Sequence, residues 1–156
     1  MLTKHMRKMS NMSSTVLNHK LKRYGHIFEL IGNTPMVRIN RMNPNPRVEI
    51  CAKLEGFNPM GSVKDRIALR MIERAEKEGN LTRDKVILEA TSGNTGISVA
   101  WVAALKGYQC AILMPTAVSV ERRKIVKALG ARIILASTEK EVVRKARELS
   151  KIRGIS

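Results

Sequence analysis

The chain has 156 residues, of which 44% are hydrophobic, 27% charged and only 3% aromatic. This apolar content excludes a fully disordered chain, and no apolar run approaches the roughly 18 residues that a membrane span needs. The 29 lysine and arginine residues outnumber the 13 acidic ones, for a formal charge of +16. Such an excess is typical of proteins with an anionic partner: a nucleic acid, a membrane surface or a phosphorylated small molecule.

The N-terminal segment carries part of this charge and contains no acidic residue before Glu29. It lacks sustained periodicity and the apolar centre of a secretory signal. We therefore expect residues 1–25 to form a basic, poorly ordered leader and residues 26–156 to form the domain. A transit peptide and an over-extended start are the alternatives for the leader.

Short apolar runs and helical patterns alternate after the leader. Runs rich in strand-forming residues lie at residues 48–54, 86–90, 110–115 and 131–136. Helical patterns lie at residues 63–75, 97–106, 119–129 and 138–149, the first three followed by a glycine that ends the helix. Short continuous apolar runs are typical of strands buried on both faces of a parallel sheet. The order predicts an α/β fold with an open parallel sheet and flanking helices in three layers.

The segment between the second apolar run and its helix is made entirely of small or polar residues: Thr91, Ser92, Gly93, Asn94, Thr95 and Gly96. Ligands of open α/β sheets bind beyond the carboxyl ends of the strands, and a helix N-terminus favours an anion. A tight turn capped by Thr95 is the simpler alternative, but such a turn needs only one hydroxyl residue. We therefore interpret residues 91–96 as an anion-binding loop.

A second loop, residues 58–66, contains Lys64. Ser62 and Asp65 have the spacing of a capping box, so we expect the helix to begin at Val63 and to hold Lys64 in its first turn. The helix dipole opposes a positive charge there and favours the neutral amine, which is a nucleophile toward carbonyl groups. A surface lysine paired with Asp65 explains this segment alone equally well. Together, the amine and the anion loop suit a carbonyl cofactor or a substrate with a carboxylate.

Other chemistries have less support. Neither loop has the glycine spacing of a dinucleotide or P-loop site. The aromatic residues are scattered rather than interleaved with the charge, which argues against a dedicated nucleic-acid site. Cys51 and Cys110 have no CxxC partner or nearby histidine, so we expect reduced core cysteines of a cytoplasmic chain and no metal site.

Four motifs follow one another along the chain. They are Leu30-Ile31-Gly32-Asn33-Thr34-Pro35; Lys53-Leu54-Glu55 with Asn58-Pro59 and Gly61-Ser62-Val63-Lys64-Asp65-Arg66; Glu89-Ala90 with residues 91–96; and Met114-Pro115 with Ser119, Glu121-Arg122-Arg123 and Ala128-Leu129-Gly130-Ala131. In this order they resemble the cysteine synthase and cystathionine β-synthase family of fold-type II pyridoxal phosphate (PLP) enzymes. The resemblance covers residues 26–147.

The resemblance implies a role for specific residues. Lys64 is implied as the catalytic Schiff-base lysine, and Asn94 as a second cofactor contact, at the PLP ring hydroxyl. The implied substrate-carboxylate loop consists of Thr91, Ser92, Gly93, Asn94 and Thr95. The implied reaction is β-replacement on an activated serine with sulfide or another thiol to give cysteine, with PLP as the electron sink. The implied partners are therefore a small amino-acid substrate and a thiol, with neither a specific nucleic acid nor a membrane.

The family places its PLP-phosphate loop in the second half of chains roughly twice this long, which form two domains. This sequence contains no Gly-Gly pair. We therefore expect residues 26–156 to be a truncated PLP-dependent enzyme domain, inactive alone, that a complementary C-terminal half or a homodimer completes. The alternatives are a catalytically dead remnant that serves as a binding or interaction module, and a basic polyanion-binding protein.

Overall fold

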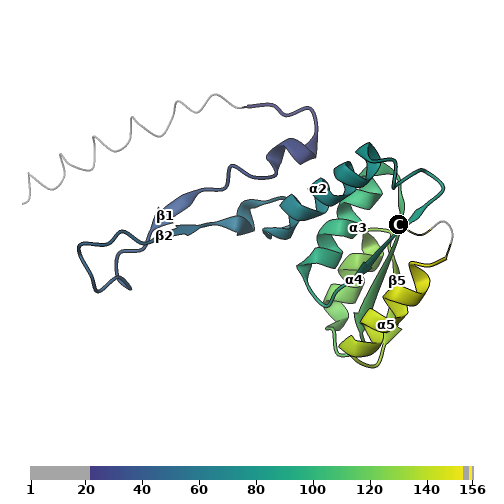
Figure 1. The fold of residues 1–156 in the computed structure, drawn as a ribbon. Helices are drawn as coiled ribbons and strands as arrows, with labels where there is room; N and C mark the ends of the chain where they lie inside the picture. The colour runs from purple at the N-terminus through teal and green to yellow at the C-terminus, as the bar shows by residue number, and fades with distance from the viewer. Residues whose placement is uncertain (1–21, 153–154, 156) are drawn as a thin grey trace, which may run out of the picture.

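The structure is a computed structural model that describes residues 22–152 and residue 155. Most of the expected leader, residues 1–21, therefore lies outside the described residues. Figure 1 shows a layered α/β body, with an arm, residues 32–57, that extends away from it. No helix in the described part of the chain is long and apolar enough to cross a membrane.

A three-stranded parallel sheet forms the centre of the body. Its strands are β3 (Val86–Ala90), β4 (Gln109–Pro115) and β5 (Arg132–Ala136), in the order β3-β4-β5. In the register of the sheet, Leu88 lies opposite Ala111 and Leu113 lies opposite Ile134. The central strand is buried from Cys110 to Pro115, as expected for a strand covered on both faces. The predicted α/β fold and three of the four predicted apolar strands are confirmed.

Four helices cover the two faces of this sheet (Figure 1): α2 (Lys64–Lys77), α3 (Asn94–Lys106), α4 (Val120–Ala128) and α5 (Glu139–Leu149). The larger core joins Ile72, Val99 and Val126 of the first three helices to Ile112 of the sheet. The smaller core packs Val142 of α5 against Leu113 on the other face. The three-layer prediction is therefore confirmed.

The residue 48–54 run is a partial failure of the prediction. Only its central part is a strand, β2 (Cys51–Lys53), and it pairs antiparallel with β1 (Met36–Arg38) in a separate two-stranded sheet. A strand only 12 residues before β2 can pair with it locally, whereas a parallel neighbour would require a long crossover. Cys51 is consequently exposed, which contradicts the expectation of a core cysteine, whereas Cys110 is buried as expected.

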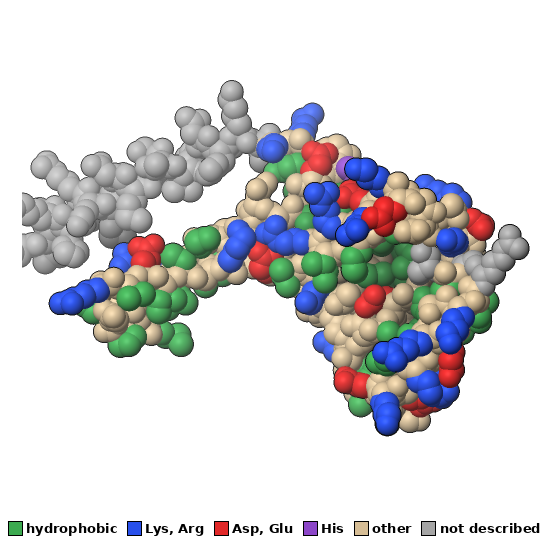
Figure 2. Space-filling model, viewed as in Figure 1, with side chains coloured by type: hydrophobic (Ala, Val, Ile, Leu, Met, Phe, Trp, Pro, Cys, Tyr) green, Lys and Arg blue, Asp and Glu red, His purple; other side chains and the backbone are tan. Residues whose placement is uncertain are grey.

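The arm carries exposed apolar side chains, among them Met36, Met42 and Phe57. Two short 3-10 helices flank the pair of strands: η1 (Ile27–Leu30) before it and η2 (Glu55–Phe57) after it. Figure 2 shows apolar side chains gathered on the arm, whereas lysines and arginines on the body lie among acidic residues. The visible face of the body therefore does not show one continuous basic surface.

Candidate functional site

The helices α2 and α3 run side by side in the same direction. Near their N-termini, the Ser98 hydroxyl donates a hydrogen bond of 2.6 Å to the Asp65 carboxylate. Near their C-termini, the Lys106 ammonium lies 2.7 Å from the Glu76 carboxylate. The positive ends of both helix dipoles therefore lie at one end of the body, next to the carboxyl end of β3, where they favour an anion.

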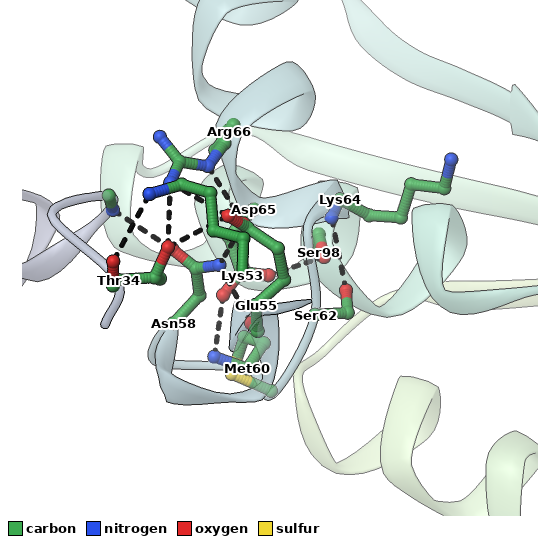
Figure 3. Close-up of polar contacts among 11 residues, drawn as sticks. Thr34, Lys53, Glu55, Asn58, Met60, Ser62, Lys64, Asp65, Arg66 and Ser98 are labelled. Atoms are coloured by element: carbon green, nitrogen blue, oxygen red, sulfur yellow. Dashed lines mark hydrogen bonds and ion pairs between the residues drawn. The ribbon is translucent and has the colours of Figure 1, made fainter. Parts of the chain in front are cut away.

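Lys64 is the first residue of α2 and is half-buried. Its backbone N–H donates to the Ser62 hydroxyl at 3.1 Å. Its side chain extends away from the polar cluster around Arg66 (Figure 3). Within residues 22–152, its amine takes part in no ion pair or hydrogen bond described for the structure. Lys64 therefore lies in the first turn of α2, as predicted.

Two local expectations for this helix are wrong. The helix begins at Lys64, with Val63 at the N-cap position, and Ser62 and Asp65 do not form a capping box. The Asp65 carboxylate instead accepts hydrogen bonds from the backbone N–H of Met60 at 2.7 Å and from Ser98. The alternative of a Lys64–Asp65 surface pair is also contradicted, because Asp65 is fully buried among these other partners.

The loop of residues 91–96 connects β3 to α3. The Thr91 N–H donates to the Leu113 carbonyl at 3.0 Å, and the Thr91 hydroxyl accepts from the Gly93 N–H at 3.1 Å. The helix begins at Asn94, three residues earlier than predicted, so Asn94 and Thr95 belong to its first turn. The first backbone N–H groups of a helix have no partner within the helix and are donors for an anion.

Gly96 allows this loop to lie close to the sheet. A Cβ atom at this position would lie 2.8 Å from Cγ2 of Thr91 and 3.0 Å from Cγ2 of Ile112. The first distance is shorter than side-chain packing permits and the second is very tight, so a larger residue would have to displace the Thr91 and Ile112 side chains. The close approach of the loop to the sheet is therefore a packing reason for a glycine at this position.

Arg122 is a site residue to which the sequence assigned no role. Its Nη1 donates a hydrogen bond of 2.9 Å to the Ser92 carbonyl, so α4 holds the middle of the loop. A hollow of about 260 Å³ lies beside this loop, lined by Thr91 and Ser92 together with Pro115, Glu139 and Val142. Lys64 and Asn94 are not among its lining residues, so the loop has one side toward this hollow and its helical end toward α2.

The polar cluster around Arg66 joins the arm to α2 (Figure 3). The Glu55 carboxylate accepts hydrogen bonds from Thr34, Asn58 and Arg66, and the Asn58 side-chain oxygen accepts from the Gly32 N–H at 2.9 Å. The hydrogen bonds from Arg66 are the main cause that lowers the pKa of Glu55 to about 2. The motif residues of the arm therefore hold the start of α2 in place.

Comparison with known proteins assigns the chain to a family. Residues 27–155 match the family described as pyridoxal-phosphate dependent enzyme. The chain is 51% identical over 131 residues to a cysteine synthase of a Flavobacterium species, covering 82% of this chain and 42% of that protein. It is 52% identical over 126 residues to cystathionine beta-synthase of Mus musculus, covering 80% of this chain and 22% of that protein.

Solved structures agree with this placement. A cysteine synthase of Entamoeba histolytica superposes with a TM-score of 0.82 at 36% identity, over 90% of this chain and 44% of the other. A hydrogen sulfide-producing enzyme of Fusobacterium nucleatum superposes with a TM-score of 0.78 at 46% identity, over 86% of this chain and 46% of the other. The chain thus spans less than half the length of each of these relatives.

Proposed function

Because the chain belongs to the family of pyridoxal-phosphate dependent enzymes, we propose that it supplies the catalytic lysine and the substrate-carboxylate loop of a cysteine synthase. PLP is the cofactor that this membership implies. The proposed reaction replaces the leaving group of an activated serine with sulfide to give cysteine. The cysteine synthases among the relatives support this choice.

The observation that carries the proposal is the shared position of two helix N-termini. The Asp65–Ser98 hydrogen bond holds the first turn of α2, with Lys64, against the first turns of α3, with Asn94. A lysine amine without an ion-pair partner among the described residues fits a carbonyl cofactor. The N-terminal N–H groups and hydroxyls of residues 91–96 fit a carboxylate.

Each residue then has a separate task. Lys64 would hold PLP through its amine and move a proton at the substrate Cα. Asn94 would donate its side-chain amide to the ring oxygen, and Thr91, Ser92, Gly93 and Thr95 would bind the substrate carboxylate. When bound, PLP supplies an electron sink for the bonds that break at the substrate Cα and Cβ.

We further propose that the 156-residue chain gives little turnover alone and that a complementary segment or a second subunit completes the site. Its coverage of only 42% of the Flavobacterium cysteine synthase supports this.

The free thiols of Cys51 and Cys110 support a cytoplasmic location, where thiols stay reduced.

Selective reaction of Lys64 with PLP tests the proposal. The chain is incubated with PLP, reduced with borohydride, digested and mapped by mass spectrometry, beside Lys64→Ala and the control Lys77→Ala at the exposed end of the same helix. We expect the adduct to concentrate at Lys64, to vanish in Lys64→Ala and to persist in Lys77→Ala. An adduct spread over exposed lysines and unchanged in Lys64→Ala would contradict the proposal.

A further inference from the structure

We propose that Asp65 is a positioning residue that sets the direction of Lys64 relative to the loop of residues 91–96. The inference rests on the proposed function, in which Lys64 reacts and this loop binds the substrate carboxylate. It assigns a task to a fully buried side chain that is not among the residues proposed to bind PLP or the substrate.

The contacts of Asp65 reach two different segments. One carboxylate oxygen accepts from the Met60 backbone N–H, in the loop before α2, and the other accepts from the Ser98 hydroxyl on α3. Asp65 and Ser98 are both fully buried. A buried carboxylate is costly unless it is hydrogen-bonded, and such charge-assisted bonds are strong and directional. The three segments are therefore held in one arrangement at this point.

The place of this contact relates it to the site. Asp65 follows Lys64 directly, and Ser98 lies four residues after Asn94, one helical turn along α3. Neighbouring residues of an α-helix project in directions about 100° apart. With the Asp65 side chain fixed against α3, the direction in which Lys64 leaves α2 is fixed as well. A rotation of α2 about its axis would change the direction of the amine relative to the loop.

The other end of the helix pair has its own contact, which serves as an internal control. Glu76 of α2 accepts hydrogen bonds from Lys106, at 2.7 Å, and from the Tyr108 hydroxyl, at 2.9 Å. This contact holds the same two helices together, but it lies at their C-terminal ends, far along the chain from Lys64. Its loss weakens the packing without freeing the first turn of α2.

The test compares the rate of PLP adduct formation at Lys64 with stability in the 156-residue chain. The variants are Asp65→Ala, Asp65→Asn, Ser98→Ala and the matched control Lys106→Met, each assayed where urea unfolding shows it folded. We expect Asp65→Ala and Ser98→Ala to slow the reaction at Lys64 roughly tenfold or more, since small displacements of a reacting group are costly. Lys106→Met should lower the unfolding midpoint and leave this rate unchanged.

Asp65→Asn provides the rescue. Its amide oxygen still accepts from Met60 and its NH₂ group donates to the Ser98 oxygen, so we expect most of the rate to return. If Asp65→Ala does not fold, Ser98→Ala carries the test. Two results would overturn the inference and leave the proposed function standing. One is equal slowing of adduct formation in Ser98→Ala and Lys106→Met, and the other is an unchanged rate in the folded Asp65 and Ser98 variants. No selective Lys64 adduct in the parent chain overturns the proposed function and the inference together.

Discussion

Arg66 holds Glu55 through two hydrogen bonds, from Nε to Oε2 at 2.8 Å and from Nη2 to Oε1 at 3.0 Å. This pair joins the 3-10 helix η2, at the base of the arm, to the first turn of α2. The Thr34 hydroxyl donates to the same carboxylate at 2.8 Å. The extended segment is thus attached to the body through this ion pair, next to Phe28 and Ile31, which pack against the core.

The Glu55–Arg66 pair predicts a specific pH dependence of stability. In the folded chain the pKa of Glu55 is about 2, below the ordinary value of about 4.3. The Glu55 carboxylate therefore stabilises the fold above about pH 4.3, and this contribution disappears as the pH falls toward 2. Glu55→Gln should lower the urea midpoint at pH 7, and its difference from the parent chain should shrink between pH 4.3 and 2. Urea titrations across this range measure the difference.

The exposed pair of Arg70 and Glu73 supplies the control for that measurement. The Arg70 side chain is 84% exposed, and exposed pairs contribute little to stability. Glu73→Gln should therefore leave the midpoint almost unchanged at every pH. If the urea midpoint of Glu55→Gln stayed below that of the parent chain by the same amount down to pH 2, the hydrogen-bonded carboxylate would not be the source of the difference.

The sequence predicts elements well where burial alone specifies them. The predicted strand at residues 110–115 is found in β4 and is buried throughout, because a strand covered on both faces has a continuous apolar sequence. The start of α5 also agrees, since the Thr138 hydroxyl accepts from the Glu141 N–H at 3.2 Å. The partner of β2 could not be predicted in this way, because β1 has three residues, all exposed, and carries no burial pattern.

In the candidate site, too, local sequence patterns were predictable and tertiary contacts were not. Glycines, hydroxyl residues and a lysine in the loops between strands and helices suggested Lys64 and residues 91–96 as candidate site residues. The Asp65–Ser98 contact was missed because its residues are 33 positions apart, and only the packing of α2 on α3 brings them together. The spacing of Ser62 and Asp65 instead suggested a cap, a local pattern that the tertiary partner of Asp65 overrides. The Arg122 contact with Ser92 depends likewise on how α4 packs.

Gly96 offers a second prediction, based on space. Gly96→Ala should lower the free energy of unfolding by about 1–3 kcal/mol, the usual cost of overpacking, because its Cβ would meet Cγ2 of Thr91 and of Ile112. Adding Thr91→Ser removes one of these methyl groups and should restore part of the loss. Gly56→Ala is the matched control, since its Cβ would find no atom closer than 4.0 Å. Urea unfolding of these three variants beside the parent chain measures these differences.

The two cysteines give a third prediction, about accessibility. Burial raises the pKa of the Cys110 thiol to about 12, whereas Cys51 is exposed on the arm. At pH 8, iodoacetamide should modify Cys51 in the folded chain and modify Cys110 only after urea is added. The Cys51 thiol donates to the Glu49 carboxylate, which raises the pKa of Cys51, so Glu49→Gln should speed its labelling. Equal labelling of both thiols without urea would contradict the layered body.

The last prediction concerns the hydrogen bond from Arg122 to the Ser92 carbonyl. A partly exposed bond of this kind contributes about 1 kcal/mol, so its loss in Arg122→Gln should raise the local opening of the loop about fivefold. Peptide-resolved hydrogen exchange reports this opening at the N–H groups of Thr91 and Gly93. Arg123→Gln is the matched control, because Arg123 donates to the Val118 carbonyl at 2.9 Å; its loss should speed exchange around residues 116–118 instead. If both variants accelerate exchange in both segments alike, α4 stabilises this edge only as a whole. Faster exchange in each variant's own segment would instead show that Arg122 acts directly on the loop of residues 91–96.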